Sequence, residues 1–270
     1  MQHSFWEKDS FLHRADLIII GSGIVGLNAA LSAKKHDKSL RIVVLERGFL
    51  PTGASTRNAG FACFGSMTEL LDDLETQSED TVFGLVERRF AGLQRLRERV
   101  GDAAMQYEAY GGYEIFCESE QAIFEKCAVK IGDFNNKLQT ILKIKNIYSI
   151  DNEIFIKNNF ATVKNCIANK AEGQIHTGKM MHALLAQCYA AGIQILNGIT
   201  VENWTEHADE IAVHTTQNFT PSKFTLSTQQ LLVCTNGFTK RLLPHLDVQP
   251  ARNQVLITKP IDNLRLRGCF

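Results

Sequence analysis

The chain has 270 residues, of which 44% are hydrophobic, so it can form a large core as two domains or as one elaborate domain. Lys and Arg together number 29 and so do Asp and Glu, which gives a formal net charge of 0. This balance argues against nucleic acid or an anionic membrane surface as a partner. A small molecule is therefore the expected partner.

The termini and cysteines favour an intracellular setting. The first fifteen residues carry several charges and no continuous apolar stretch, unlike a secretory signal, and no apolar run is long enough to cross a bilayer. Seven cysteines are scattered without a C-x-x-C pair: Cys63, Cys117, Cys127, Cys166, Cys188, Cys234 and Cys269. An odd number at such spacing favours reduced, mostly buried thiols over metal ligands or nucleophiles. We predict a cytoplasmic protein without a transmembrane segment or a metal site.

A Gly-rich turn joins an apolar strand to an apolar helix near the start of the chain. Residues 16–20 predict a buried strand, residues 24–35 a helix and residues 41–45 a second strand. Between the first two elements, Gly21 permits a tight turn, Gly23 lets main-chain N–H groups approach a pyrophosphate, and Gly26 lets the helix pack closely on the strand. The partial positive charge of the helix N-terminus faces the anion.

The second predicted strand ends in an acidic residue. Glu46 lies 20 residues after Gly26, where a carboxylate accepts hydrogen bonds from ribose hydroxyls. Strand, turn, helix and acidic residue together predict an adenine dinucleotide. NAD and FAD both remain possible on this evidence.

A second run of small residues follows at 46–65. Gly53, Ala54, Ser55, Ala59, Gly60 and Ala62 would let the backbone lie against a flat ligand. Ser55, Thr56, Arg57 and Asn58 supply donors for phosphate or ring oxygens. A flavin needs such a loop because its pyrophosphate and tricyclic ring extend past the first turn, whereas NAD does not. An NAD-dependent Rossmann enzyme is thus the less favoured alternative, which a nicotinamide-binding titration would test.

The motifs at 21–26, 43–47 and 53–60, with two later stretches, resemble the flavin-dependent oxidoreductases of the D-amino-acid oxidase, glycine oxidase and sarcosine oxidase type. The resemblance implies FAD as the cofactor. In that family a glutamate like Glu46 holds the adenosine ribose, and the residue after it, Arg47 here, lies near the adenine. The segment that matches 54–61 runs beside the pyrophosphate and the flavin.

The middle of the chain interrupts this pattern. Residues 68–80 are acidic, and residues 82–100 alternate apolar positions with five arginines, which predicts amphipathic helices. Residues 111–116 predict a turn and a strand, residues 119–142 a helix, and residues 148–156 an alternating strand. We assign this block to part of a substrate domain.

The nucleotide-binding pattern resumes at residue 172. A loop over 172–178, a helix over 179–190 and a strand over 191–201 follow one another. His176 in the loop is expected to be a structural polar group rather than a substrate contact. Val201 would otherwise be a core residue, but the resemblance implies that its backbone contacts the adenine.

Two late stretches complete the resemblance. Residues 211–216 and 223–227 predict an antiparallel meander, and residues 231–238 predict a buried strand that runs into a turn. Thr235, Asn236 and Gly237 in this turn are expected to contact the dinucleotide. Residues 250–258 resemble the Pro-x-Arg-Gly-Gln-Val stretch of the family, with Asn253 in place of the glycine, so Arg252 is not counted as a site residue.

The predicted fold class is α/β, with an FAD-binding, Rossmann-like doubly wound sheet, an antiparallel meander and an incomplete α+β substrate domain. The FAD-binding domain is expected over 12–85 and 165–247, and the partial substrate domain over 86–164 and 248–270. Members of the family continue for roughly another hundred residues, so we expect a fragment of a longer protein. The expected cofactor-binding residues are Gly21, Ser22, Gly23, Ile24, Val25, Gly26, Glu46, Arg47, Ala54, Ser55, Arg57, Asn58, Ala59, Gly60, Phe61, Val201, Thr235, Asn236 and Gly237.

The expected function is oxidation of an amino acid or amine by hydride transfer from substrate carbon to flavin N5, with oxygen or another electron acceptor. Because the cofactor carries the difficult step, this chemistry needs little from acid–base side chains. The sequence contains no convincing catalytic dyad, and the catalytic residues stay unknown. Two alternatives are a flavin dehydrogenase of a 2-hydroxy acid or polyol phosphate, and an FAD-binding chain without turnover.

Overall fold

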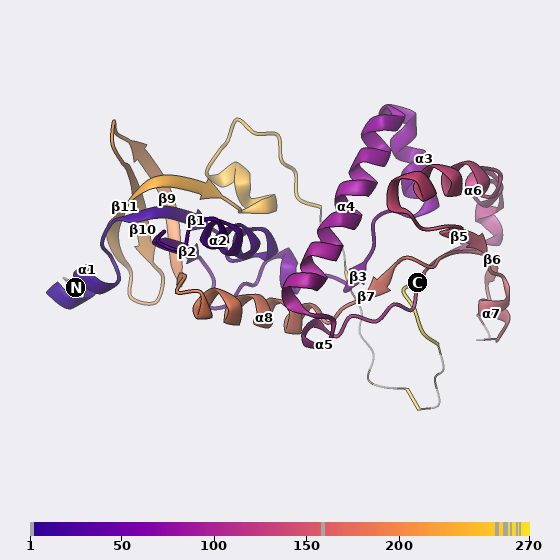
Figure 1. Cartoon of the computed structure of the whole chain (residues 1–270), viewed down its shortest axis with the longest axis horizontal. Coiled ribbons are helices and arrows are strands. Elements are labelled where there is room, and N and C mark those ends of the chain that lie inside the picture. Colours follow the sequence, from indigo (N-terminus) through magenta and orange to yellow (C-terminus); the bar gives the residue numbers. More distant parts are fainter. Residues whose placement is uncertain are drawn as a thin grey trace. The chain divides into compact units, whose positions relative to one another are not determined.

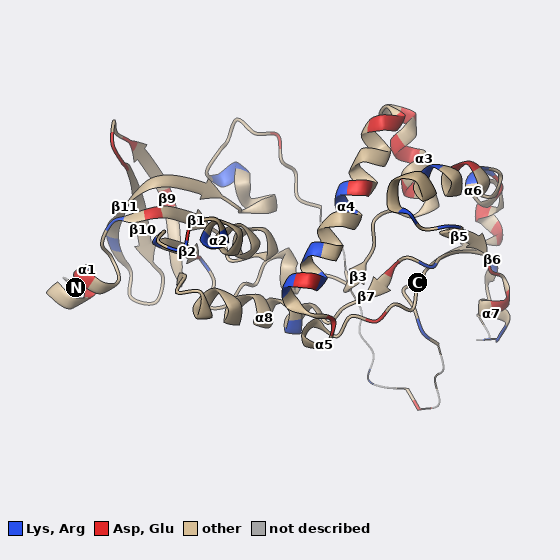
Figure 2. Ribbon diagram, in the orientation of Figure 1, with Lys and Arg blue, Asp and Glu red and all other residues tan. Residues whose placement is uncertain are grey.

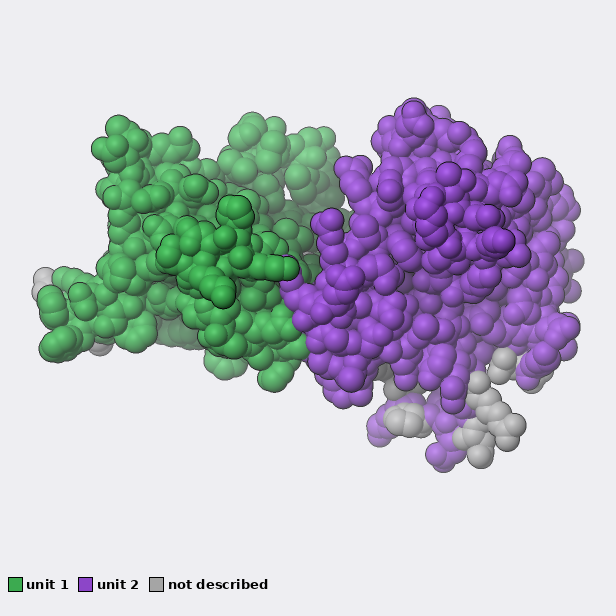
Figure 3. Space-filling view, viewed as in Figure 1, with its two compact units in different colours: residues 1–58, 181–255 green, residues 59–180, 256–270 purple. Residues whose placement is uncertain are grey.

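The computed structural model describes residues 3–157, 160–251, 254–255, 259, 261–262, 264 and 266–270 (Figure 1). Residues 1–58 and 181–255 form one compact unit, unit 1, and residues 59–180 and 256–270 form unit 2 (Figure 3). These boundaries differ from those of the predicted domains. Because compactness does not report ligand binding, the assignment of an FAD-binding and a substrate domain stays a prediction. Much of the predicted 250–258 stretch, including Arg252 and Asn253, lies outside the described residues.

Unit 1 is built on a mixed sheet of six strands. In order across the sheet the strands are β8 (Gln194–Asn197), β2 (Ile42–Glu46), β1 (Ala15–Ile20), β11 (Ser222–Val233), β10 (Ile211–Gln217) and β9 (Ile199–Glu206). β8, β2, β1 and the second half of β11 are parallel, whereas β9 and β10 form an antiparallel meander with β11. The α/β class with a mixed parallel and antiparallel sheet is confirmed.

Successive apolar residues of β1 face opposite sides of the sheet in unit 1, and a helix covers one of these sides. Ile18 and Ile20 face the core formed with the meander, while Ile19 points to the opposite face, against which α2 packs. The helical elements are α1 (Phe5–Ser10), α2 (Ile24–His36), η1 (Ala54–Thr56), η3 (Asn236–Arg241) and the larger part of α8 (Thr177–Ala190). Leu27 of α2 is fully buried, and its carbonyl oxygen lies 3.8 Å from Cys188 Sγ of α8.

β11 differs from its predicted form. The predicted meander strand at 223–227 and the predicted buried strand from residue 231 are one continuous strand. Its first half pairs antiparallel with β10 as far as Thr228, and from Thr228 it pairs parallel with β1. Leu232 keeps 39% of its surface exposed, so the burial predicted there is wrong. The periodicity of one strand cannot show that its two halves have different neighbours.

Unit 2 combines helices with two small sheets. Its helical elements are α3 (Met67–Thr76), α4 (Glu79–Val100), α5 (Asp102–Met105), η2 (Glu118–Glu120), α6 (Gln121–Leu142), α7 (Glu153–Lys157) and the first residues of α8. Its strands are β3 (Phe61–Ala62), β4 (Gly112–Cys117), β5 (Tyr148–Ile150), β6 (Val163–Asn169) and β7 (Gly173–Gln174). β4, β6 and β5 form one antiparallel sheet, and β3 pairs with β7.

The amphipathic helices predicted over 68–100 are present as α3 and α4. Their buried side chains, among them Leu70, Val82 and Val86, join α6 and the β4–β6–β5 sheet in one core. Charges of both signs lie along α4, whereas α3 carries acidic residues (Figure 2). No helix among the described residues is both long and apolar enough to cross a membrane.

The alternating strand predicted at 148–156 is wrong beyond Ile150. β5 ends there, and residues 153–157 form the short helix α7. The break lies at Asn152, whose Oδ1 accepts a hydrogen bond from the N–H of Cys166 at 2.8 Å. This side-chain hydrogen bond replaces the main-chain hydrogen bond that would continue the strand pairing. The apolar pattern alone does not reveal it.

Candidate cofactor site

The first Gly-rich turn lies at the point where the strand order of the parallel sheet reverses. The chain moves from β1 to β2 to β8 on one side, and β11 adds on the other side of β1. Open parallel sheets bind ligands at the carboxyl ends of the strands beside this reversal. Gly21 follows β1, and Cys234, which follows β11, donates from its N–H to the carbonyl oxygen of Ile20 at 2.8 Å.

Each glycine of the turn meets a different constraint. Gly21 has φ of +106°, and a Cβ there would lie 2.6 Å from the carbonyl oxygen of Cys234. A Cβ at Gly26 would overlap the carbonyl oxygen of Gly21. The tight turn and the close helix packing predicted for these two positions are therefore present.

Gly23 has an ordinary extended backbone, so its own conformation does not require glycine. It is the N-cap of α2 and, as glycine, supplies no capping side chain of its own, although Ser55 Oγ accepts from the N–H of Ile24. The other N–H groups of the first turn and the positive potential of the helix start can face an anion. These features fit the pyrophosphate of a dinucleotide.

The two separate runs of small residues meet within unit 1. Ser55 Oγ, in η1 of the second run, accepts a hydrogen bond from the N–H of Ile24 at 2.9 Å. The second run also supports itself, since Thr56 Oγ1 donates to the carbonyl oxygen of Pro51 at 2.6 Å and Asn58 Nδ2 donates to that of Ala54 at 2.9 Å. We call residues 21–26 and 53–58 together the cradle.

The carboxylate of Glu46 is held beside the first turn. Its Oε2 accepts hydrogen bonds from the N–H and the hydroxyl of Ser22 at 3.1 and 2.8 Å, and its Oε1 accepts one from the N–H of Gly48 at 2.8 Å. Ser22 is fully buried. Oε2 uses both of its acceptor sites on Ser22, but Oε1 can accept one more hydrogen bond, so this position fits a ribose hydroxyl.

Arg47 lies against an aromatic side chain that the sequence did not single out. Its guanidinium lies 4.7 Å from the ring centre of Phe238 in η3, and its carbonyl oxygen accepts a hydrogen bond from Asn218 Nδ2 at 2.9 Å. Phe238 directly follows the predicted residues 235–237, but its contact with Arg47 spans most of the chain. Sequence spacing therefore gave no signal for this pair.

The other predicted residues of unit 1 have mixed surroundings. Val201 is buried in the core of the sheet, which is the alternative the sequence left open, and a role for its backbone stays a prediction. In the turn after β11, Asn236 has φ of +46°, and Thr235 Oγ1 lies 3.0 Å from Thr239 Oγ1. A Cβ at Gly237 would lie 2.8 Å from Pro250. The predicted residues of unit 1 that are exposed to solvent are Val25, Arg47, Ala54, Arg57, Asn58 and Asn236.

Ala59, Gly60 and Phe61 continue the second run but belong to unit 2. Gly60 has φ of +78°, and its carbonyl oxygen accepts a hydrogen bond from the N–H of Ile175 at 2.8 Å. Phe61 pairs with Gln174 in the β3–β7 ladder, and 48% of its surface is exposed. Its binding role stays a prediction.

A cavity of about 300 Å³ lies in unit 2, with Phe61 in its wall. Other lining residues are Cys63, Met67, Glu114, Asn169 and Glu172. Glu172 is buried, and desolvation, aided by the negative charges of Glu69 and Glu114, raises its pKa to about 7. The cavity therefore contains a carboxyl group that titrates near neutral pH.

His176 has the structural role that its position predicted. Its Nδ1 accepts a hydrogen bond from the N–H of Lys179 at 3.2 Å, in the first turn of α8. The side chain thus satisfies a donor that the helix leaves without an internal partner.

Burial keeps several of the cysteines protonated. Burial raises the pKa of Cys127 to about 11 and those of Cys166 and Cys269 to about 12. Burial also raises the pKa of the more exposed Cys63. These thiols stay protonated at neutral pH and are poor nucleophiles.

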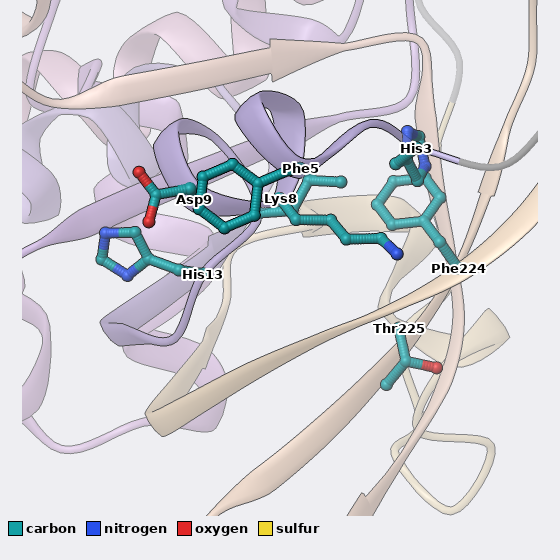
Figure 4. Close-up of a pocket in the computed structure, with 8 residues that line it drawn as sticks. His3, Phe5, Lys8, Asp9, His13, Phe224 and Thr225 are labelled. Carbon is teal, nitrogen blue, oxygen red and sulfur yellow. The ribbon is translucent and has the colours of Figure 1, made fainter.

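A separate, open hollow lies beside α1 in unit 1 (Figure 4). His3, Lys8 and Asp9 line it together with Phe224 and Thr225 of β11 (Figure 4). These last two residues lie near the start of β11, whereas the first turn lies beside its end. Phe224 and Val233 lie nine positions apart, a distance of about 30 Å in a strand, so this hollow is not part of the cradle.

Known proteins share this sequence pattern and fold. A probable oxidoreductase, OrdL, from Haemophilus influenzae is 22% identical over 261 residues, which cover 93% of this chain and 57% of the relative. Glycine oxidase from Geobacillus kaustophilus aligns with a TM-score of 0.63 and 18% identity, over 85% of this chain and 57% of its own. L-Amino acid deaminase from Proteus myxofaciens, solved in complex with anthranilate, aligns with a TM-score of 0.63 and 16% identity, over 85% of this chain and 47% of its own.

The chain thus spans about half the length of these proteins. At such identities the likeness to the solved structures establishes the fold. A family match covers more of the sequence, since residues 16–268 match the family described as FAD dependent oxidoreductase. Because this match includes both runs of the cradle and extends over most of the chain, the chain belongs to the FAD dependent oxidoreductase family.

Proposed function

We propose that the protein binds FAD in the cradle and oxidises an amino acid or amine. The observation that carries the proposal is the hydrogen bond from the N–H of Ile24 to Ser55 Oγ, which joins the two runs of small residues at the start of α2. A dinucleotide with a long tricyclic end needs both runs. This contact supports FAD over NAD, for which the first run suffices.

The predicted site residues have distinct proposed roles. The start of α2 at Gly23 binds the pyrophosphate, Glu46 accepts hydrogen bonds from the ribose, and Arg47 with Phe238 lies beside the adenine. The segment from Ala54 to Phe61 runs along the flavin. FAD, when bound, would supply the acceptor for a hydride from the substrate carbon, and the substrate would leave as an iminium ion that water hydrolyses.

The amine class of substrate is supported by the proteins that share the fold. Glycine oxidase and L-amino acid deaminase are named for amino-acid substrates. We assign no catalytic acid or base, because the chain's contribution to this chemistry is to orient the substrate and to exclude water from it. The alternative of a flavin dehydrogenase of a 2-hydroxy acid or polyol phosphate uses the same cradle.

FAD binding is tested with the variant Gly23→Asp. The extended backbone at this N-cap accepts aspartate, and an N-cap carboxylate stabilises the helix, so the variant folds. The same carboxylate repels the pyrophosphate, and we expect at least about a 100-fold loss of FAD affinity, about 2.7 kcal/mol. Quenching of flavin fluorescence measures the affinity, and circular dichroism checks the fold. A folded variant that binds FAD as tightly as the wild-type protein contradicts the proposed cradle.

The substrate class is tested by anaerobic bleaching of the FAD-loaded protein. The panel contains glycine, sarcosine, L-proline and D- and L-alanine, with lactate and glycerol 3-phosphate as the competing class. Bleaching by an amine supports the proposal. Bleaching by lactate or glycerol 3-phosphate alone assigns the protein to the hydroxy-acid or polyol-phosphate class. A yellow protein that no compound bleaches indicates FAD binding without turnover.

A further inference from the structure

A short segment of unit 2, Phe61–Thr68, continues directly from the residues proposed to lie along the flavin. We call it the wall segment, because Phe61, Cys63, Ser66 and Met67 line the 300 Å³ cavity. Its start is fixed to β7, where Phe61 pairs with Gln174 and Ala62 with Gly173. The position of its remaining residues depends on side chains from other elements.

Glu172, just before β7, bonds the middle of the wall segment. Its Oε1 accepts a hydrogen bond from the N–H of Phe64 at 3.2 Å, and the N–H of Gly65 also donates to this carboxyl group. Only 8% of the Glu172 surface is exposed. A buried carboxyl group that accepts hydrogen bonds from two main-chain N–H groups holds both the side chain and the backbone in place, because neither partner can bond to water instead.

β4 leaves room for this carboxyl group only because it begins with glycine. A Cβ at Gly112 would overlap Glu172 Oε2. The carboxyl group therefore lies between bare backbone of β4 and the N–H groups of the wall segment. Its position is determined by close packing on both sides.

Other groups secure the rest of the wall segment. Tyr148 donates from its hydroxyl to the carbonyl oxygen of Gly65 at 2.6 Å, and the N–H of Met67 donates to Glu114 Oε2 at 3.0 Å. Glu114 also accepts from the N–H of Thr68 at 3.3 Å. Burial raises the pKa of Glu172 to about 7, so the charge of this partner changes near neutral pH.

We propose that Glu172 is a positioning residue, which holds the middle of the wall segment through the N–H groups of Phe64 and Gly65, while pairing with β7 holds its start at Phe61, and so sets the shape of the cavity wall that follows the residues proposed to lie along the flavin. This inference rests on the proposed function, since it takes the flavin to run along residues 54–61. Glu172 contacts the segment and not the reacting atoms, so it acts through the wall segment.

The surroundings of Glu172 give the expected pH dependence. Glu69 of α3 and Glu114 of β4 add negative potential, and the remaining titratable groups that interact with it are Cys63, Tyr107, Tyr148 and Cys269. Arg89 of α4 forms an ion pair with Glu69 at 2.7 Å. Ionised Glu172 accepts stronger hydrogen bonds than the neutral acid, so the hold on the wall segment tightens as pH rises through about 7.

The test follows the backbone amide resonances of Phe64 and Gly65 by NMR in the cofactor-free chain from pH 5 to pH 9. In the wild-type protein both resonances are expected to titrate with a midpoint near 7. Glu172→Gln keeps an acceptor oxygen but has no charge to lose, so this titration disappears. Glu69→Gln is the matched control, since it removes a nearby carboxylate that does not bond these amides, and the titration persists. Amides that do not titrate in the wild-type protein, or that still titrate in Glu172→Gln, overturn the proposal.

A second readout uses the visible absorption spectrum of the FAD-loaded protein over the same pH range. A spectrum that shifts with the midpoint of the amides, and that is independent of pH in Glu172→Gln, supports the link to the flavin. FAD that binds without such a shift overturns the positioning role even if the amides titrate. Failure of FAD to bind contradicts the proposed function instead, so the two failures are distinct.

Discussion

At the scale of single residues, the cradle depends on the positions of its glycines. Gly21 and Gly26 are required by contacts within the protein, because a Cβ at either position meets a main-chain carbonyl oxygen. Gly23 is different, since its backbone is ordinary and its nearest neighbour is the flexible hydroxyl of Ser55. The fold thus constrains Gly23 less than Gly21 and Gly26, and its approach to a pyrophosphate stays a prediction.

The packing role of Gly26 predicts a loss of stability in Gly26→Ala. The added Cβ overlaps main chain, which cannot move away as a side chain can, so we expect a loss of about 1–3 kcal/mol in the free energy of unfolding. Gly84→Ala in α4 is the control, because no atom lies within 4 Å of its Cβ position. At position 84, alanine is expected to raise the free energy of unfolding by about 1 kcal/mol. Urea unfolding followed by circular dichroism measures both changes, and equal effects of the two variants would contradict this reading.

At the scale of elements, the helices α3 and α4 of unit 2 begin at residues whose side chains satisfy free N–H groups of the first turn. Ser66 caps α3 and Ser78 caps α4, each by accepting a hydrogen bond from the N–H three residues later. Gly101, with φ of +85°, ends α4. These caps explain why the acidic and Arg-rich block forms two separate helices over 67–76 and 79–100.

Ser78→Ala tests the cap of α4. The variant removes the acceptor for the N–H of Thr81, which Ser78 Oγ binds at 3.3 Å, and we expect a loss of about 1 kcal/mol in unfolding free energy. Ser78→Asp restores an acceptor and adds a favourable charge at the helix start, so its stability should match the wild-type protein. Thermal and urea unfolding measure the change. A loss of the same size in Ser78→Asp would show that the hydroxyl acts in another way.

At the scale of the whole molecule, one buried carboxyl group affects stability over a wide pH range. The pKa of Glu172 is raised from 4.5 to about 7 in the folded state. The contribution of neutral Glu172 to the free energy of unfolding is fully present below pH 4.5, where the folded and the unfolded chain both hold the proton. As pH rises to about 7 the unfolded chain ionises first, so folding becomes less favourable.

The wild-type protein should lose about 3 kcal/mol more stability between pH 4.5 and pH 7 than Glu172→Gln, which has no proton to release. Urea unfolding of the two proteins at half-unit pH steps gives the difference. Subtracting one curve from the other removes the contributions of the exposed carboxyl groups, which both proteins share. Parallel curves would mean that Glu172 titrates at the same pH in the folded and unfolded states.

The local sequence pattern predicted the helices and strands themselves better than it predicted which residues lie beside one another in the folded chain. The strand, turn and helix over residues 15–36 are present within a residue or two of their predicted bounds, because alternation, Gly spacing and helix period are local signals. The prediction was wrong at 153–157, where side-chain bonds of Asn152 to β6 end the strand. Phe238 was missed because its partner Arg47 is near only in the folded chain.

By itself the sequence determined the order of elements and the two runs of small residues, since each depends on residues within a few turns of one another. Only the tertiary structure decided which of these runs, caps and carboxyl groups meet. Ser55 reaches Ile24 across 31 residues, and Glu172 reaches Phe64 across 108. Such contacts depend on the strand order of a whole sheet, and that order is set by burial of the complete core, which no short stretch of sequence contains.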